Sequence, residues 1–263
     1  MVKIGLFDSG LGGLTVVHEV RRRLPGAGVE FYGDNGRNPY GPRPQAEIVK
    51  FSRQILDFLA GKGIDLAIIA CNTATAAALA EVQDAYPFPV LGVIEPGARA
   101  ALAASKSRRI GVIGTEFTIR SGAYTRALQG LSPGVQVLGQ ACPLFTPLVE
   151  QGRTAGPEPE AAARAYLAAF RGSGIDTLIL GCTHYPVLID VIRAHLDPGV
   201  TTVDPAVETV AQAKLLLGAE ATLPAAAPTY RFYTSGDPEL FARLGSNILG
   251  RPLENVTRVT FPE

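Results

Sequence analysis

Short apolar runs alternate with amphipathic stretches along this chain of 263 residues. The segments 66–70 and 177–181 are rich in Ile and Leu and are followed by helix-capping residues, a pattern typical of buried parallel strands. Residues 44–60 instead place their apolar side chains on one helical face and end at Gly61, which predicts an amphipathic helix. Strands that alternate with helices at this spacing predict an α/β fold with doubly wound, mainly parallel sheets. Further elements are expected as helices over 73–86, 158–170 and 207–217 and as a strand over 229–234.

The same pattern occurs twice in the chain, in the same order. Four matches between the first and second copies support this: 3–7 with 109–113, 29–33 with 135–139, Cys71 with Cys182, and 94–96 with 203–205. The first two pairs share one offset, and ordered matches with small length changes indicate two copies of one α/β unit. Open α/β sheets bind ligands at the carboxyl ends of their strands, so two thiols at such ends could face one small molecule from opposite sides.

The repeat predicts two pseudo-symmetric domains, each with its own sheet, and an active site between them. The join between the copies falls near Pro96 and Gly97. The chain beyond about residue 207, which includes an Ala/Pro-rich stretch over 221–228, has no counterpart in the first copy, so we expect it to return to the first domain. The predicted domains are 1–97 plus 207–263, with Asp8 and Cys71, and 98–206, with Glu150, Cys182 and His184.

Composition narrows the classes of protein that fit. The chain is 47% hydrophobic and 18% charged, and 24 basic residues balance 24 acidic ones, so it has no basic field for nucleic acid or an anionic membrane. No run approaches the roughly 20 apolar residues of a membrane span, and an acid at position 8 precedes any signal-peptide core. We therefore expect a cytoplasmic globular protein whose partner is a small polar molecule.

The three cysteines are too few, and wrongly spaced, for a disulfide framework. Cys71 and Cys182 each precede residues typical of a helix amino terminus or tight turn, where the pKa of a thiol falls below about 8.5. Either thiol could then act as a base near neutral pH. The alternative, that they are small buried apolar residues, is weakened by the duplicated context, whereas Cys142 has no such partner and is expected to be structural.

A glycine-rich loop follows the first predicted strand, from Asp8 to Gly13. Thr15 stands where a dinucleotide fingerprint needs glycine, so main-chain N–H groups here favour a small anion such as a carboxylate. Asp8 could face an ammonium group, or it could simply cap the following helix.

His184, two residues after Cys182, is a candidate acid/base partner of that thiol or an ordinary turn residue. We expect no metal, because His18 and His195 lie in helix-like contexts without a ligand pattern. Glu150 closes an apolar segment and is unremarkable from its pattern alone.

Several of these segments together match one known family. They are residues 5–15, 38–42, 70–75, 92–97, 114–124 and 180–186. In these segments the chain closely resembles the cofactor-independent glutamate racemases of bacterial cell-wall synthesis, members of the aspartate/glutamate racemase family. The resemblance spans roughly the first two thirds of the chain.

The resemblance implies a two-base reaction that supplies D-glutamate for peptidoglycan. Cys71 would take the α-proton from D-glutamate and Cys182 from L-glutamate, with Asp8 assisting the first thiol, and His184 and Glu150 the second. Asp8 and His184 would also contact the substrate, together with Ser9, Tyr40, Gly41, Asn72, Thr73, Thr115, Thr118 and Thr183. No cofactor is expected, because no lysine lies in the matching segments to form the Schiff base of a pyridoxal enzyme. A homodimer is compatible with the resemblance.

Three other functions remain open at this point. An aspartate racemase would share the two-thiol logic, although Thr75 stands where those enzymes tend to carry histidine. A non-catalytic binding protein for acidic amino acids would use the glycine loop alone, and a nucleotide-binding α/β protein would use it for phosphate. The chain also departs from the glutamate racemase pattern at Asn35, Asn38, Gln151 and Pro205.

Overall fold

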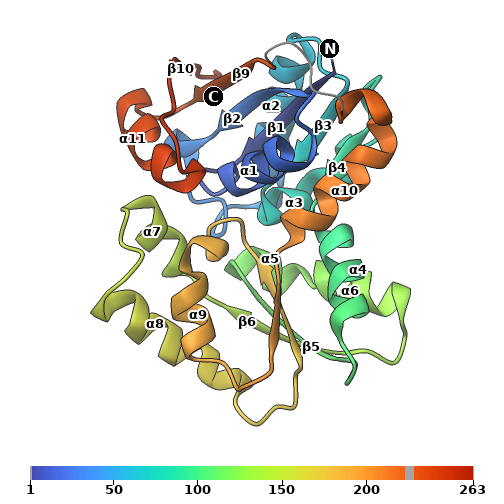
Figure 1. Cartoon of the computed structure of the whole chain (residues 1–263), viewed down its shortest axis with the longest axis vertical. Coiled ribbons are helices and arrows are strands. Elements are labelled where there is room, and N and C mark those ends of the chain that lie inside the picture. Colours follow the sequence, from blue (N-terminus) through green and yellow to red (C-terminus); the bar gives the residue numbers. More distant parts are fainter. Residues whose placement is uncertain (1, 223–227, 263) are drawn as a thin grey trace.

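The computed structural model describes residues 2–222 and 228–262. Within these residues the chain forms two lobes, one built on a six-stranded sheet and the other on a four-stranded sheet (Figure 1). All neighbouring strands in both sheets are parallel. The predicted α/β fold with two mainly parallel sheets is therefore confirmed.

The first sheet has the strand order β10-β9-β2-β1-β3-β4. Its strands are β1 (Lys3–Asp8), β2 (Gly28–Gly33), β3 (Leu66–Ile69), β4 (Val90–Gly92), β9 (Tyr230–Thr234) and β10 (Val256–Arg258). One face packs on α1 (Leu14–Arg23), α10 (Pro205–Leu217) and α11 (Pro238–Leu249). The other packs on α2 (Gln45–Ala60) and α3 (Asn72–Val82). The C-terminal strands thus extend the sheet that the N-terminal strands begin.

The second sheet has the order β6-β5-β7-β8. Its strands are β5 (Arg109–Gly114), β6 (Gln136–Ala141), β7 (Thr177–Gly181) and β8 (Thr201–Val203). Helices α4 (Ile94–Ala104) and α6 (Ala123–Leu131) cover one face. The other is covered by α7 (Phe145–Glu150), α8 (Pro157–Leu167), α9 (Ile189–Ala194) and the 3₁₀ turns η2 (Ala168–Phe170) and η3 (Tyr185–Leu188). The remaining short elements are α5 (Glu116–Ser121), η1 (Asn35–Arg37) and η4 (Ala219–Ala221).

The repeat seen in the sequence is a repeat of topology. The order β2-β1-β3-β4 in the first sheet is matched by β6-β5-β7-β8 in the second. In each sheet the strand order reverses between the first strand of the copy and the strand that precedes the cysteine. Such a switch point is where ligands bind in doubly wound sheets, and Cys71 and Cys182 lie just beyond β3 and β7 at these points.

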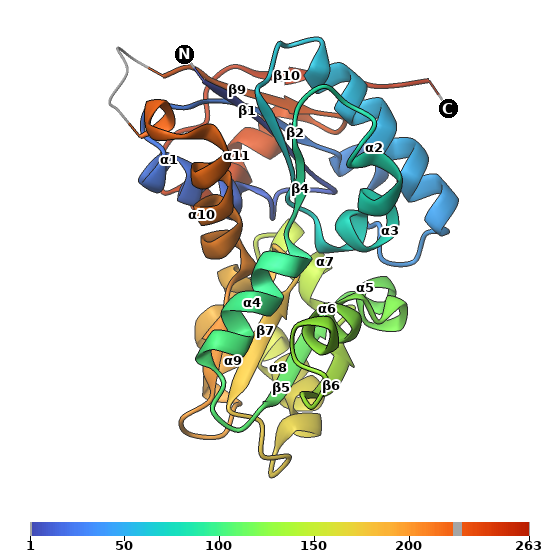
Figure 2. The ribbon, with the colours of Figure 1, turned by 90° about the vertical axis from the view of Figure 1, so that its right-hand side faces the viewer.

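The two lobes are connected through helices that pack side by side, α4 and α10 (Figure 2). Pro96 and Gly97, where the sequence places the join, lie inside α4. A Cβ at Gly97 would stand 2.9 Å from the Pro205 ring, so the two helices approach closely at their first turns. The domain boundaries at 97/98 and 206/207 stay a prediction.

Some helix ends differ from expectation. The helix expected over 73–86 ends at Val82, and a loop containing Pro87 and Pro89 leads into β4. The helix expected from 207 begins at Pro205, because Asp204 caps it and proline suits the first helical turn. The Ala/Pro-rich stretch falls mostly on 223–227, outside the described residues. None of the described helices combines the length and apolar character needed to span a bilayer.

Helix α11 offers a test of how firmly the C-terminal segment belongs to the first lobe. Phe241 is 2% exposed, and its ring lies 6.2 Å from that of Phe31 on β2. We expect Phe241→Ala to lower the free energy of unfolding by about 3–5 kcal/mol in urea denaturation. Leu240→Ala, one residue away and 45% exposed, is the control and should change it by less than about 0.5 kcal/mol. If Phe241→Ala changed the free energy of unfolding as little as Leu240→Ala is expected to, α11 would contribute nothing to the core of this lobe.

Candidate active site

Residues from both lobes are hydrogen-bonded to one another where the carboxyl ends of the two sheets meet. The Thr183 hydroxyl, after β7, donates to Asp8 Oδ1, at the end of β1, at 3.0 Å. The N–H of Leu11 in the glycine loop donates to Glu150 Oε1 at 2.8 Å. Hydrogen bonds at Asp8, Leu11, Glu150 and Thr183 therefore join the two sequence copies.

Gly12 allows this close approach of the lobes. A Cβ at this position would collide with the Thr183 hydroxyl and lie 2.6 Å from His184 Nδ1. The glycine loop thus lies directly against the second lobe, with its main chain facing the Cys182 motif.

Cys71 is the N-cap of α3, as its position before a polar turn predicts. Its sulfur accepts the Ala74 N–H at 3.4 Å and lies 3.6 Å from the Ser9 hydroxyl oxygen. The side chain is 5% exposed. Cys71 and Asp8 therefore end adjacent strands and lie beside the same loop residue, Ser9.

The expected lowering of the Cys71 pKa is wrong for this structure. Burial raises the pKa of the thiol to about 12, and the negative charge of Asp8 adds to the effect. The hydrogen bonds from Ala74 and Ser9 act in the opposite direction but do not compensate. Desolvation outweighs the helix terminus because the sulfur is enclosed on all sides.

Asp8 is fully buried and does not cap α1, whose N-cap is Gly13. Its second carboxylate oxygen accepts the Gly10 N–H at 3.0 Å. Burial raises the pKa of Asp8, while the charge of His184 and these two hydrogen bonds limit the rise. The helix-cap alternative is therefore excluded, and a polar role in the site remains.

Cys182 lies beside a histidine and a threonine of its own lobe. Its sulfur is 3.6 Å from His184 Nδ1 and 3.6 Å from the Thr146 hydroxyl. The other ring nitrogen of His184 lies 2.6 Å from Glu150 Oε1. Burial by itself would lower the pKa of His184, but hydrogen bonds to Cys182 and Glu150 raise it well above its ordinary value. The His184 ring thus lies between the Glu150 carboxylate and the Cys182 sulfur, and the two contacts favour its charged form.

Three predicted substrate contacts form a cluster of hydroxyl groups between α3 and α5. Thr73 Oγ1 lies 2.8 Å from Thr115 Oγ1 and 3.4 Å from Thr118 Oγ1, and the last two are 3.0 Å apart. Gly41 lies against Thr115, where a Cβ would be 3.1 Å from the Thr115 Cβ. The cluster thus brings hydrogen-bond donors from both lobes together.

A cavity of about 140 Å³ opens next to this cluster. It is lined from the first lobe by Pro39, Gly41 and Pro42 and from the second by Thr115, Glu116, Pro143, Thr146 and Pro147. Thr146 also contacts Cys182, so this cavity adjoins the second thiol. A larger hollow of about 590 Å³ between α1 and β9 contains none of the predicted site residues.

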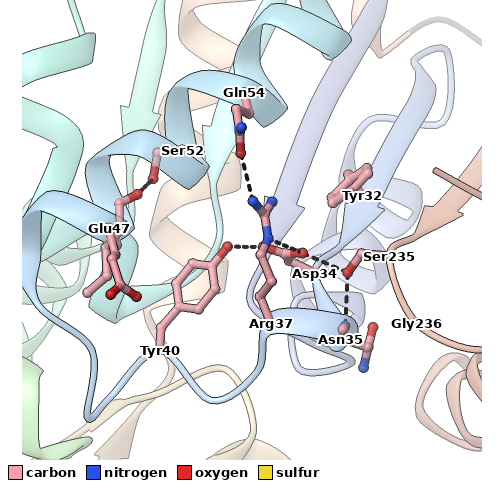
Figure 3. A network of polar contacts seen from close by, with 12 residues as sticks. Tyr32, Asp34, Asn35, Arg37, Tyr40, Glu47, Ser52, Gln54, Ser235 and Gly236 are labelled. Carbon is pink, nitrogen blue, oxygen red and sulfur yellow. Dashed lines mark hydrogen bonds and ion pairs between the residues drawn. The ribbon is translucent and has the colours of Figure 1, made fainter. Parts of the chain in front are cut away.

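Two predicted contacts use their side chains elsewhere. The Tyr40 ring is buried in the first lobe, and its hydroxyl donates to the Asp34 carboxylate (Figure 3). The Asn72 carbonyl oxygen accepts from the Tyr124 hydroxyl at 2.6 Å. The side chains of Tyr40 and Asn72 are thus hydrogen-bonded within the protein. A ligand could contact these two residues through their main chains or through the Asn72 NH₂ group.

Cys142 is fully buried in the core of the second lobe, where its sulfur donates to the Gln140 carbonyl at 3.7 Å. His195 pairs with Glu160 at 2.7 Å, away from the thiols. Across residues 2–222 and 228–262 there is no cluster of three or more His, Cys, Asp or Glu side chains that could hold a metal.

The structure adds residues that the pattern did not select. Thr146, which contacts Cys182, and Tyr124, which holds Asn72, carry no local sequence feature that marks them. Asn35 and Asn38 both contact Glu150, yet in the sequence they stand out only as departures from a pattern. Such residues are found only when the loops are brought together in space.

Comparison with known proteins identifies the family of this chain. A family model described as Asp/Glu/Hydantoin racemase matches residues 13–213. The chain belongs to this family. A glutamate racemase of Geobacter metallireducens is 44% identical to this racemase over 259 residues, covering 98% of this chain and 96% of that protein. The expected membership is thereby confirmed, and with it the expectation of an enzyme.

Solved structures support the same family assignment. A glutamate racemase isoform from Bacillus anthracis aligns with this racemase at a TM-score of 0.92 and 38% identity, covering 99% of this chain and 98% of that one. A glutamate racemase from Francisella tularensis, solved in complex with D-glutamate, aligns at a TM-score of 0.90 and 36% identity, covering 98% and 97%.

The raised pKa of Cys71 can be tested by thiolate absorbance at 240 nm. A raised pKa keeps the proton on sulfur to higher pH, so the difference between wild type and Cys71→Ala should stay near zero up to about pH 10. The same difference in urea should titrate near the ordinary value of about 8.5. A native titration midpoint between about pH 8 and 9 would contradict the effect of burial.

Proposed function

We propose that this racemase interconverts L- and D-glutamate without a cofactor, with Cys71 and Cys182 as the two bases. The observation that carries the proposal is that the two thiols follow equivalent strands, β3 and β7, and that the loop residues next to them are in contact across the two lobes. Ser9 contacts Cys71, the adjacent Asp8 bonds Thr183, and Thr183 precedes Cys182. The names and close similarity of the relatives favour glutamate as the substrate.

The two thiols have different roles in each direction of the reaction. His184, held by Glu150, lies beside the Cys182 sulfur, while burial raises the pKa of Cys71 and keeps the proton on its sulfur. This arrangement suits L-glutamate: Cys182 takes the α-proton, a carbanion forms, and the Cys71 thiol delivers its own proton to the opposite face. The product is D-glutamate, with Cys182 now a thiol and Cys71 a thiolate, and the reverse reaction starts from that state.

The thiolate left on Cys71 has local support. It keeps the Ala74 N–H at the amino terminus of α3 and can accept the Ser9 hydroxyl proton. We propose that Asp8, which adjoins Ser9 in the chain, assists on this side and faces the ammonium group of the substrate.

Neutral donors are proposed to bind the two substrate carboxylates. The proposed donors are main-chain groups near Gly41 and Asn72 and the hydroxyl groups of Ser9, Thr73, Thr115, Thr118 and Thr183. Fixed dipoles of this kind stabilise charge that develops in the transition state. We propose that they replace the electron sink that a cofactor would supply.

The proposed product gives the enzyme its place in the cell. D-Glutamate formed here would supply peptidoglycan synthesis. The proposal places the substrate between domains 1–97 plus 207–263 and 98–206, so entry requires movement about the paired helices α4 and α10. A homodimer remains compatible with it.

Deuterium incorporation tests the reaction and its substrate. Incubation with either enantiomer of glutamate in D₂O should place deuterium on the α-carbon and convert the enantiomer, as followed by NMR and chiral chromatography. Parallel incubations with L- and D-aspartate test the alternative racemase. Tight binding of glutamate without α-exchange would instead identify a binding protein.

The cysteines provide the mutational prediction. Cys71→Ala and Cys182→Ala should each lower racemisation kcat by about 100- to 10,000-fold, because each removes one proton-transfer group. Cys142→Ala is the matched control, since this thiol is equally buried but hydrogen-bonds only to the Gln140 carbonyl. Its kcat should stay within a few-fold of wild type. Loss of turnover in Cys142→Ala alone would overturn the assignment of the bases.

A further inference from the structure

Glu150 lies at the end of α7 in the second lobe, but most of its hydrogen bonds come from the first. Oε1 accepts from the Leu11 N–H at 2.8 Å and lies 3.4 Å from Asn38 Nδ2, while Oε2 accepts from Asn35 Nδ2 at 2.9 Å. From its own lobe, His184 Nε2 lies 2.6 Å from Oε1. The orientation of the carboxylate that faces His184 is therefore set largely by the opposite lobe.

The side chain of Asn35 is itself fixed. Its carbonyl oxygen accepts from the Thr234 hydroxyl at 3.3 Å, which turns its NH₂ group toward Glu150. An amide whose oxygen and nitrogen are both hydrogen-bonded has a defined orientation. Asn35 therefore links Thr234, at the end of β9, to the Glu150 carboxylate.

The segment that carries Asn35 is anchored by a buried carboxylate, Asp34. Asp34 is fully buried and accepts from the Ser235 hydroxyl at 2.6 Å, from Arg37 Nε at 2.8 Å, and from the Tyr40 hydroxyl (Figure 3). Arg37 reaches on to the Gln54 side chain on α2 at 2.7 Å. The loop between β2 and α2 is thus held by hydrogen bonds to Ser235, just after β9, and to Gln54, on α2.

We propose that Asn35, supported by Asn38, is a positioning residue for the Cys182 half of the reaction. Asn35 holds the Glu150 carboxylate so that Oε1 remains hydrogen-bonded to His184 Nε2. The other ring nitrogen of His184 then remains in contact with the Cys182 sulfur. Because the amide is neutral, it orients Glu150 without placing a further charge beside His184. The inference rests on the proposed two-thiol racemisation of glutamate.

The hydrogen bonds connect Asn35 to Cys182 but not to Cys71. Asn35 is linked to Cys182 through Glu150 and His184. Cys71 is held instead by Ser9 and Ala74, which make no hydrogen bond to Asn35. A residue that only stabilised the loop would affect both proton transfers alike, whereas a positioning residue slows the transfer at Cys182.

Isotope effects separate these two roles. Asn35→Ala removes one hydrogen bond to a charged group, so kcat from L-glutamate should fall about 10-fold. With α-deuterated L-glutamate the isotope effect should increase, because Cys182 removes the deuterium in the slowed step. With α-deuterated D-glutamate it should decrease, while the solvent isotope effect increases, because Cys71 removes the deuterium and Cys182 delivers a solvent proton.

Two further variants complete the experiment. Asn38→Ala, which removes the longer contact, should shift the isotope effects in the same directions by less. Asn247→Ala, an exposed residue on α11, is the control and should match wild type. Equal changes in both directions, or none, in a racemising and folded Asn35→Ala enzyme would overturn the positioning role alone. A wild type that exchanges no α-proton of glutamate would overturn the proposed function, and this role with it.

Discussion

The hydrogen bond between Thr183 and Asp8 joins the carboxyl ends of β7 and β1 across the two lobes, at 3.0 Å. Parallel strands direct all their carboxyl ends to one edge of a sheet, so each lobe has a single edge on which chemistry can be assembled. When two such edges face each other, the residues after β3 and β7 necessarily approach one small volume. The thiols, the glycine loop and the hydroxyl cluster all owe their proximity to this arrangement.

The two similar cysteines are almost equally buried but have different polar neighbours. Cys71 has a helix terminus and a hydroxyl group as partners, and these do not offset its desolvation. Cys182 has the His184 imidazole beside it, backed by the Glu150 carboxylate. The same motif, copied twice, thus places its two thiols in different surroundings, and the proposed reaction uses this difference at the two faces of a single carbon.

Much of this architecture could be predicted from the sequence, because the duplicated strands are short, apolar and separated by helices of ordinary length. The positions of Cys71, Cys182 and Asp8 followed from where their strands end. The role of Glu150 did not, since its pattern is that of a surface acid and its partners at Leu11 and Asn35 are more than a hundred residues away in the chain. The pKa of Cys71 also depends on enclosure by residues from several segments, which no local pattern contains.

Gly12 has a consequence for how such a site can change. With no side chain, its main chain rests against Thr183 and His184, and a single methyl group would strike both. Any larger residue there would have to displace the Thr183 hydroxyl and the His184 ring from their present positions. The absence of a side chain at one position in the first lobe therefore determines where two side chains of the second lobe can lie.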